Sequence, residues 1–141
     1  MEFNKQKRLM GIDFGLKRIG IAFSDPFRLF ASAHSTIFCK GEEQDIQSIS
    51  DLAKAQDVGL IIMGLPFQMD GKEGEIALKV KDFANKLIKV SGISVVFVDE
   101  RLTSHEANEI LKSAKVKTID RKAMLDKISA QIILQTYMNK M

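Results

Sequence analysis

The sequence contains a single cysteine, Cys39, among 141 residues. One cysteine cannot form an internal disulfide, and it excludes a zinc site built from several cysteines. Cys39 lies in the strand-like stretch STIFCK, so we expect a plain buried thiol there rather than a nucleophile. Histidine is also scarce, because only His34 and His105 are present, and we expect both to be structural.

Long apolar runs are missing as well. No stretch of the chain approaches the roughly 20 apolar residues that a membrane-spanning helix needs. The first ten residues, MEFNKQKRLM, lack the apolar core of a signal peptide. We therefore expect a cytoplasmic protein that has no membrane partner.

Basic residues only slightly outnumber acidic ones. The sequence has 21 Lys and Arg against 18 Asp and Glu, a formal net charge of +3. So small an excess says little about a polyanionic partner, because the position of the charges matters more than their sum. There are no repeats, low-complexity tracts or linker-like segments, so we expect one domain over residues 1–141.

The first part of the chain predicts three strands. Residues 8–14 and 18–24 are short apolar runs joined by a tight turn at Gly15, a residue that permits positive φ and close backbone approach. Residues 32–38 alternate moderately between polar and apolar side chains. The closeness of the three segments in sequence favours an antiparallel meander.

The middle of the chain alternates helices with strands. Apolar residues recur at helical spacing over 42–57 and 75–90. Between and after them, 58–64 and 93–99 are apolar runs of the kind found in buried parallel strands. The segment TSHE at 103–106 fits a capping box and predicts a further helix.

Near the C-terminus we expect a loop over 115–122 and a last helix whose N-terminus is capped by Asp120. The order of all these elements predicts an α/β fold. Its mixed five-stranded sheet has three antiparallel strands followed by parallel strands, and helices flank the sheet.

Acidic residues stand at unexpected places in these elements. Asp13 lies in the middle of an apolar strand, where an unpaired carboxylate is costly. Asp99 and Glu100 end the last strand, and Asp126 lies inside the last helix. If the first strand is central and the last runs parallel to it, their ends are neighbours. The small residue Ala130 then lets the helix approach the same edge of the sheet.

Carboxylates that converge repel one another unless a cation lies among them or protons are taken up. Oxygen ligands without cysteine favour Mg²⁺ or Mn²⁺ over zinc. A pair of such ions about 3.5–4 Å apart can activate water and stabilise the leaving oxygen of a phosphodiester. The spacing alone leaves other roles open: Asp13 can cap a turn, Asp99 can pair with Arg101, and Asp126 can be a solvated helix acid.

Four stretches of the chain resemble a known family. They are GIDFGLKRIGIAFSDP, IIMGLPFQMDGKEG, VFVDERLTSHEA and DKISAQIILQTYM. In order and spacing they resemble the signature blocks of the YqgF/RuvX family, from about residue 8 to the C-terminus. Family members have an RNase H-like fold and are described as Holliday junction resolvases or pre-16S rRNA nucleases. The chain departs from the pattern at Ser129, where alanine is usual, and at Phe67 and Gln68, where Leu-Asn is common.

The resemblance implies that Asp13, Glu100 and Asp126 are catalytic and hold one or two Mg²⁺ or Mn²⁺ ions. Adjacent strand residues point to opposite faces, so only one of the neighbouring acids Asp99 and Glu100 is expected to face the metal. We favour Glu100 and keep Asp99 as its substitute.

Nucleic-acid contacts are expected from glycine and basic residues near these acids. Arg101 adjoins the acids, and an arginine can hold a phosphate through two hydrogen bonds. The segment 112–127 is basic and can hold a nucleic-acid backbone, or it can be a solvated face. The expected contacts are Gly15, Arg18, Lys72, Arg101, Lys115, Lys117, Arg121 and Lys122.

The predicted function is that of a metal-dependent nuclease that processes the 5′ end of pre-16S rRNA. The resemblance implies in-line attack by water that leaves 5′-phosphate and 3′-hydroxyl ends. Alternatives are a Holliday junction resolvase acting on branched DNA, a non-catalytic RNA-binding or ribosome-associated protein, and an ATPase of the actin and sugar-kinase type. The expected partners are nucleic acid and ribosomal particles, and the protein is expected to be a monomer or a homodimer.

Overall fold

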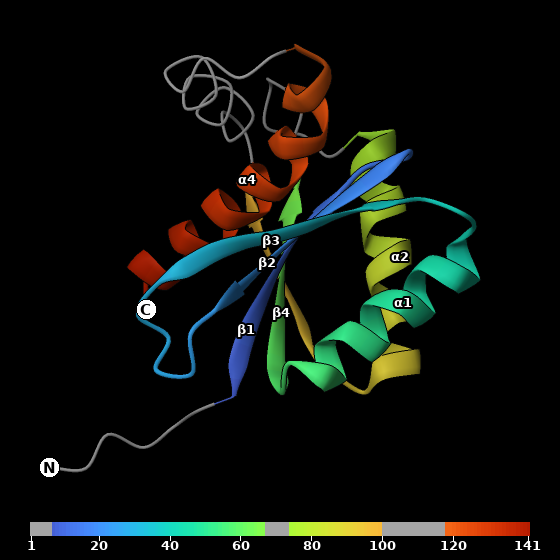
Figure 1. Cartoon of the computed structure of the whole chain (residues 1–141). Helices are drawn as coiled ribbons and strands as arrows, with labels where there is room; N and C mark the ends of the chain where they lie inside the picture. Colours follow the sequence, from blue (N-terminus) through green and yellow to red (C-terminus); the bar gives the residue numbers. More distant parts are fainter. Residues whose placement is uncertain (1–6, 67–73, 100–117) are drawn as a thin grey trace, which may run out of the picture.

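Five strands form one mixed sheet in the order β3-β2-β1-β4-β5 (Figure 1). The computed structural model describes residues 7–66, 74–99 and 118–141, and in the last range it describes the side chains from residue 124 onwards. The described elements are β1 (Arg8–Phe14), β2 (Arg18–Ser24), β3 (Ala31–Phe38), α1 (Glu42–Ala55), β4 (Val58–Leu65), α2 (Glu75–Ser91), β5 (Val95–Asp99) and α4 (Thr118–Asn139).

The sheet confirms the predicted architecture. Strand β1 is central and pairs antiparallel with β2, which pairs antiparallel with β3. On its other side β1 pairs parallel with β4, and β4 pairs parallel with β5. The helix predicted from the capping box at 103–106 lies outside the described residues.

The start of the last helix differs from the prediction. Helix α4 begins at Thr118, so a loop that continues to residue 122 is wrong, and Asp120 lies within the helix instead of capping it. No glycine or proline interrupts the sequence between Thr118 and Met124. An acidic residue in a first helical turn is also favourable, because it faces the positive end of the helix dipole.

Helices cover both faces of the sheet (Figure 1). Because side chains alternate along a strand, β1 contributes to two cores. Met10 and Ile12 are fully buried on the face of α1 and α2. Leu9 is fully buried on the opposite face, with Ile133 of α4. Each fully buried large apolar side chain stabilises the fold by about 1.5–3 kcal/mol. None of the described helices is long and apolar enough to cross a bilayer.

Helix α4 packs unusually close to the sheet, because glycines lie beneath it. A Cβ atom added to Gly11 would lie 2.7 Å from the carbonyl oxygen of Ala130. A Cβ atom added to Gly20 would overlap the carbonyl oxygen of Asp126. Ala130 is fully buried, as expected for a small residue that lets the helix approach. The backbone of α4 therefore rests on the backbone of β1 and β2.

Candidate functional site

Asp13 lies near the C-terminal end of the central strand β1, on the face that α4 covers. It pairs with Gly20 in the antiparallel register, so the two residues share one face of the sheet. That face belongs to α4, because the position of a Cβ on Gly20 is occupied by the backbone of Asp126. Asp13 is partly buried and interacts with other groups of the protein.

Asp126 is brought to the same place by α4. The helix backbone at Asp126 rests on Gly20, the residue of β2 that lies directly opposite Asp13. The Asp126 side chain is only 15% exposed. Two acids that are far apart in sequence thus lie at the same end of one sheet face, each next to Gly20.

Arg18 neutralises Asp126. Its Nε donates a hydrogen bond of 2.7 Å to Oδ2 of Asp126, and the two side chains form an ion pair in which Arg18 is 30% exposed. The pair lies at the beginning of β2, next to the end of β1. A partly buried carboxylate at this point of the fold therefore has a cation beside it. A contact between Arg18 and nucleic acid stays a prediction.

Asp99 belongs to the other face of the sheet. In β5, Val96 and Val98 pack in the core under α4, whereas Val95 packs in the core under α1 and α2. Asp99 is four positions after Val95, so in the alternation of a strand both side chains lie on the same face, which is not the face of Asp13. This argues against Asp99 as the substitute for Glu100, which itself lies outside the described residues.

Several predicted residues fall outside the description. These are Glu100, Lys72, Arg101, Lys115 and Lys117, together with the side chains of Arg121 and Lys122. Within the described ranges, no group of three or more His, Cys, Asp or Glu residues is placed to hold a metal ion. The described part of the chain thus brings together two of the three predicted acids, Asp13 and Asp126.

Gly15 forms the turn between β1 and β2. A Cβ atom at this residue would lie 2.5 Å from the carbonyl oxygen of Arg18, so a larger residue does not fit. Its φ angle is not in the left-handed region, in contrast to those of Gly41 and Gly92. Glycine is thus needed at this turn because the turn's own backbone approaches closely, and not for a positive φ; a contact between Gly15 and nucleic acid stays a prediction.

Two residues at this end of the sheet were not predicted. The backbone of α4 packs directly on Gly20. The signal in the sequence is a glycine inside an apolar strand, which can mark a place where another backbone approaches closely. Phe38 pairs with Arg18 in the register, so it lies on the face of Asp126, and it is 60% exposed. An exposed aromatic ring beside the acids can stack against a nucleic-acid base.

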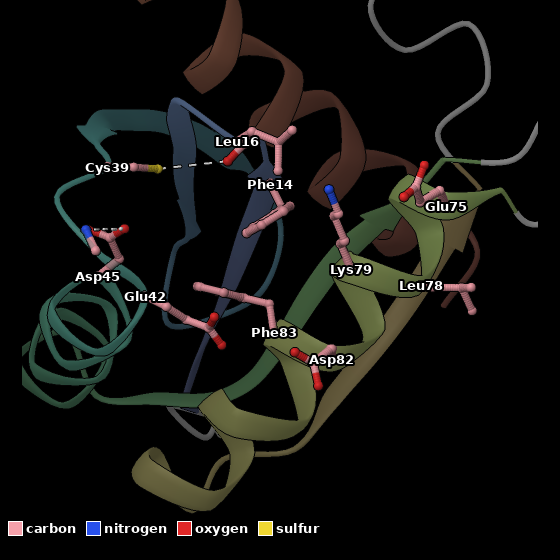
Figure 2. A pocket seen from close by; sticks show the side chains of 12 residues that line it. Phe14, Leu16, Cys39, Glu42, Asp45, Glu75, Leu78, Lys79, Asp82 and Phe83 are labelled. Atoms are coloured by element: carbon pink, nitrogen blue, oxygen red, sulfur yellow. Dashed lines mark hydrogen bonds between the residues drawn. The ribbon is translucent and has the colours of Figure 1, made fainter.

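A cavity of about 760 Å³ lies on the opposite side of the sheet, between the end of β1, the start of α1 and helix α2 (Figure 2). Its lining includes the aromatic pair Phe14 and Phe83, whose ring centroids are 4.7 Å apart. The charged residues that line it are Glu42, Asp45, Glu75, Asp82 and Lys79. Four carboxylates and one ammonium group disfavour a phosphate there, so this cavity does not suit a phosphodiester substrate.

Cys39 also lines the cavity and is half-buried. Its thiol lies 3.8 Å from the carbonyl oxygen of Gly15 and donates toward it. Burial raises the pKa of the Cys39 thiol, and the carboxylate of Asp45 raises it further. The thiol is therefore protonated at neutral pH and is a poor nucleophile, in line with the structural role expected from the sequence.

A family model described as "RuvX: Holliday junction resolvase" matches residues 7–140 of the chain. Among curated proteins, a relative from Endomicrobium trichonymphae is 43% identical over 133 residues, which cover 94% of this chain and 95% of the relative. A relative from Orientia tsutsugamushi (strain Ikeda) is 40% identical over 136 residues, which cover 96% and 86%. Both carry the name "Putative pre-16S rRNA nuclease".

Solved structures of resolvases have the same fold. RuvC of T. thermophilus, in complex with a Holliday junction substrate, superposes with a TM-score of 0.60 at 14% identity, covering 94% of each chain. The Fowlpox virus resolvase, in complex with substrate Holliday junction DNA, superposes with a TM-score of 0.57 at 12% identity, covering 94% of this chain and 97% of that one. These similarities confirm the predicted RNase H-like fold.

Proposed function

The chain belongs to the RuvX family, and we propose that it is a metal-dependent nuclease that processes the 5′ end of pre-16S rRNA. The observation that carries this proposal is the seat of α4 on Gly20, which places Asp126 beside Asp13 at one end of the sheet. The names of the relatives, which cover nearly the whole chain, support the rRNA precursor as substrate.

The acids suit a hard divalent cation. Asp13 and Asp126 offer carboxylate oxygens on one face, and Asp126 forms an ion pair with the cation Arg18. Asp13, Glu100 and Asp126 would hold one or two Mg²⁺ or Mn²⁺ ions, which supply charge stabilisation and lower the pKa of the attacking water. We choose Glu100 as the third acid because Asp99 belongs to the other face of the sheet.

The predicted basic residues would contact the phosphate backbone of the substrate. Arg101 would lie beside the acids, and Lys115, Lys117, Arg121 and Lys122 would extend the contact along the backbone. Each such contact releases counterions from the nucleic acid, so affinity would fall with rising salt. The cavity lined by acids lies on the other side of the sheet.

A Holliday junction is the second candidate substrate, because the description of the matching family names it. A junction resolvase cuts two strands symmetrically, so it would act as a homodimer. A monomer that cuts a single strand would be sufficient for rRNA processing. The oligomeric state in solution therefore helps to separate the two substrates.

A direct test compares cleavage of two end-labelled substrates by the purified full chain: a precursor rRNA 5′ leader and a four-way DNA junction. With Mg²⁺ or Mn²⁺ we expect cleavage of the leader to 5′-phosphate and 3′-hydroxyl ends, and no cleavage in EDTA. Symmetric cuts in the junction alone would make the protein a resolvase. If the protein binds the leader but cleaves it with neither Mg²⁺ nor Mn²⁺, it is a non-catalytic RNA-binding protein.

Arg18 is expected to compete with the metal for Asp126. Because Nε of Arg18 contacts Oδ2 of Asp126, replacing Arg18 by methionine removes a positive charge from that carboxylate. A partly exposed ion pair contributes up to about 1 kcal/mol, so the metal concentration for half-maximal cleavage should fall by up to about fivefold. A titration of cleavage rate against Mg²⁺ measures this. If Arg18→Met needs a higher Mg²⁺ concentration for half-maximal cleavage, Arg18 does not compete with the metal.

A further inference from the structure

The turn between β2 and β3 exposes large apolar side chains to solvent. Within residues 25–30, Phe27 is 46% exposed, Leu29 is 63% exposed and Phe30 is 71% exposed. Scattered exposed apolar residues are ordinary, but three within four positions concentrate apolar surface in one turn, and exposed apolar surface of this kind can mark a binding site. We call residues 25–30 the aromatic turn.

The aromatic turn is held in one conformation by Asp25. One carboxylate oxygen of Asp25 accepts the backbone N–H groups of Leu29 and Phe30, both at 2.8 Å, and the other accepts that of Phe27 at 3.0 Å. Partial burial raises the pKa of Asp25, but these N–H groups lower it by more, so it stays below its ordinary value of 3.8. The carboxylate of Asp25 is therefore ionised at neutral pH and stays hydrogen-bonded to these N–H groups. The backbone that carries the rings of Phe27 and Phe30 is thereby held in place.

The aromatic turn carries a cation of its own, Arg28. The Nε of Arg28 donates a 2.9 Å hydrogen bond to the carbonyl oxygen of Lys7, which ties the turn to the residues before β1. Arg28 is thus the cation of the turn, and the only acid of residues 25–30, Asp25, has both oxygens engaged by backbone N–H groups. Aromatic rings beside basic side chains are the combination that binds single-stranded nucleic acid, through stacking and phosphate contacts.

We propose that the aromatic turn is a second nucleic-acid contact, at which Phe27 and Phe30 stack on unpaired bases of the substrate while Arg28 attracts its phosphates. This inference deepens the proposed nuclease function, because it names a part of the substrate that must be single-stranded. A protein partner is the other class of ligand that an apolar patch can bind, but the positive charge of Arg28, beside an Asp25 carboxylate already engaged by N–H groups, favours a polyanion.

The position of the turn sets the length of RNA that can use it. Strand β2 runs from Arg18, which contacts Asp126, to Ser24, which precedes the turn. Seven residues at about 3.3 Å each place the turn about 20 Å from the acids. A stacked strand rises about 3.4 Å per nucleotide, so at least about six nucleotides separate the two contacts. Shorter unpaired tails should not reach the aromatic turn.

The test measures binding rather than cleavage, so it can be read even if the proposed nuclease function fails. The full chain in EDTA is titrated into fluorescein-labelled RNA hairpins that carry unpaired tails of 3 or 12 nucleotides, and anisotropy gives each Kd. We expect the longer tail to bind at least about tenfold more tightly. The double variant Phe27→Ser, Phe30→Ser should bind both tails with the Kd of the shorter one.

Leu78→Ser is the matched control, because Leu78 is 60% exposed but lies on α2 at the acid-lined cavity. It should leave both Kd values unchanged. In a separate variant, Arg28→Gln should reduce the slope of log K against log salt by about 0.7 for the longer tail. Equal affinity of the unmodified chain for both tails would overturn the proposal, as would a double variant that keeps the preference for the longer tail. A double variant that loses self-association in sedimentation instead would assign the turn to contact between copies of the chain.

Discussion

Replacing Asp13 by asparagine is expected to reduce phosphodiester cleavage by at least about a thousandfold, or about 4 kcal/mol in the activation free energy. The amide keeps the shape of the side chain but lacks the negative charge that a divalent cation requires. Asp13 lies opposite Gly20, on which the backbone of Asp126 rests, so its charge is at the centre of the proposed site. The measurement is kcat/KM for the precursor leader at saturating Mg²⁺ and Mn²⁺.

The matched control for Asp13→Asn is Asp82→Asn. Asp82 is an exposed acid of α2 that pairs with Lys86, and it lies on the other side of the sheet. Its replacement should leave kcat/KM within about twofold, because an exposed surface pair contributes little. The free energy of unfolding of both variants should lie within about 1 kcal/mol of that of the unmodified chain. If Asp13→Asn keeps more than a tenth of the activity while folded, the proposed metal mechanism is wrong.

The strands were predictable because their apolar runs are short and bounded by clear turns. The first two strands were predicted with the same limits that the structure has, Arg8–Phe14 and Arg18–Ser24. The edge strand β3 alternates only moderately, and it begins at Ala31, one residue earlier than predicted. The start of α4 at Thr118 was missed, because a stretch rich in lysine and arginine carries no apolar periodicity that would mark a helix.

The candidate site was predictable only in part. Asp13 stands out because a carboxylate in an apolar strand needs a physical reason. The ion pair between Arg18 and Asp126 joins residues 108 positions apart, and local sequence contains no information about such a contact. Gly20 was missed for a related reason: a glycine in a strand can mark a bulge, a weak point or a close approach, and only the packed helix decides among them.

Replacing Gly20 by alanine is expected to displace α4 and to remove both stability and activity. The added Cβ would overlap the carbonyl oxygen of Asp126, a backbone atom of a helix that cannot rotate away. Overpacking of this kind costs about 3 kcal/mol, or about 6–12 °C in Tm for a chain of this size. Because the overlap is at Asp126 itself, cleavage should fall more than about a hundredfold even at temperatures where the variant is fully folded.

Two other glycines separate a general loss of packing from displacement of the site. Gly59→Ala is the control away from α4: its Cβ would lie 2.8 Å from the Cβ of Lys7, so it should destabilise the fold without displacing Asp126. Gly11→Ala would press on Ala130, one turn along α4 from Asp126, so it should destabilise the fold with a smaller loss of cleavage. Equal loss of cleavage in Gly11→Ala and Gly20→Ala at matched stability would show that helix packing in general is what matters. A greater loss in Gly20→Ala shows that the seat beneath Asp126 positions the acid for catalysis.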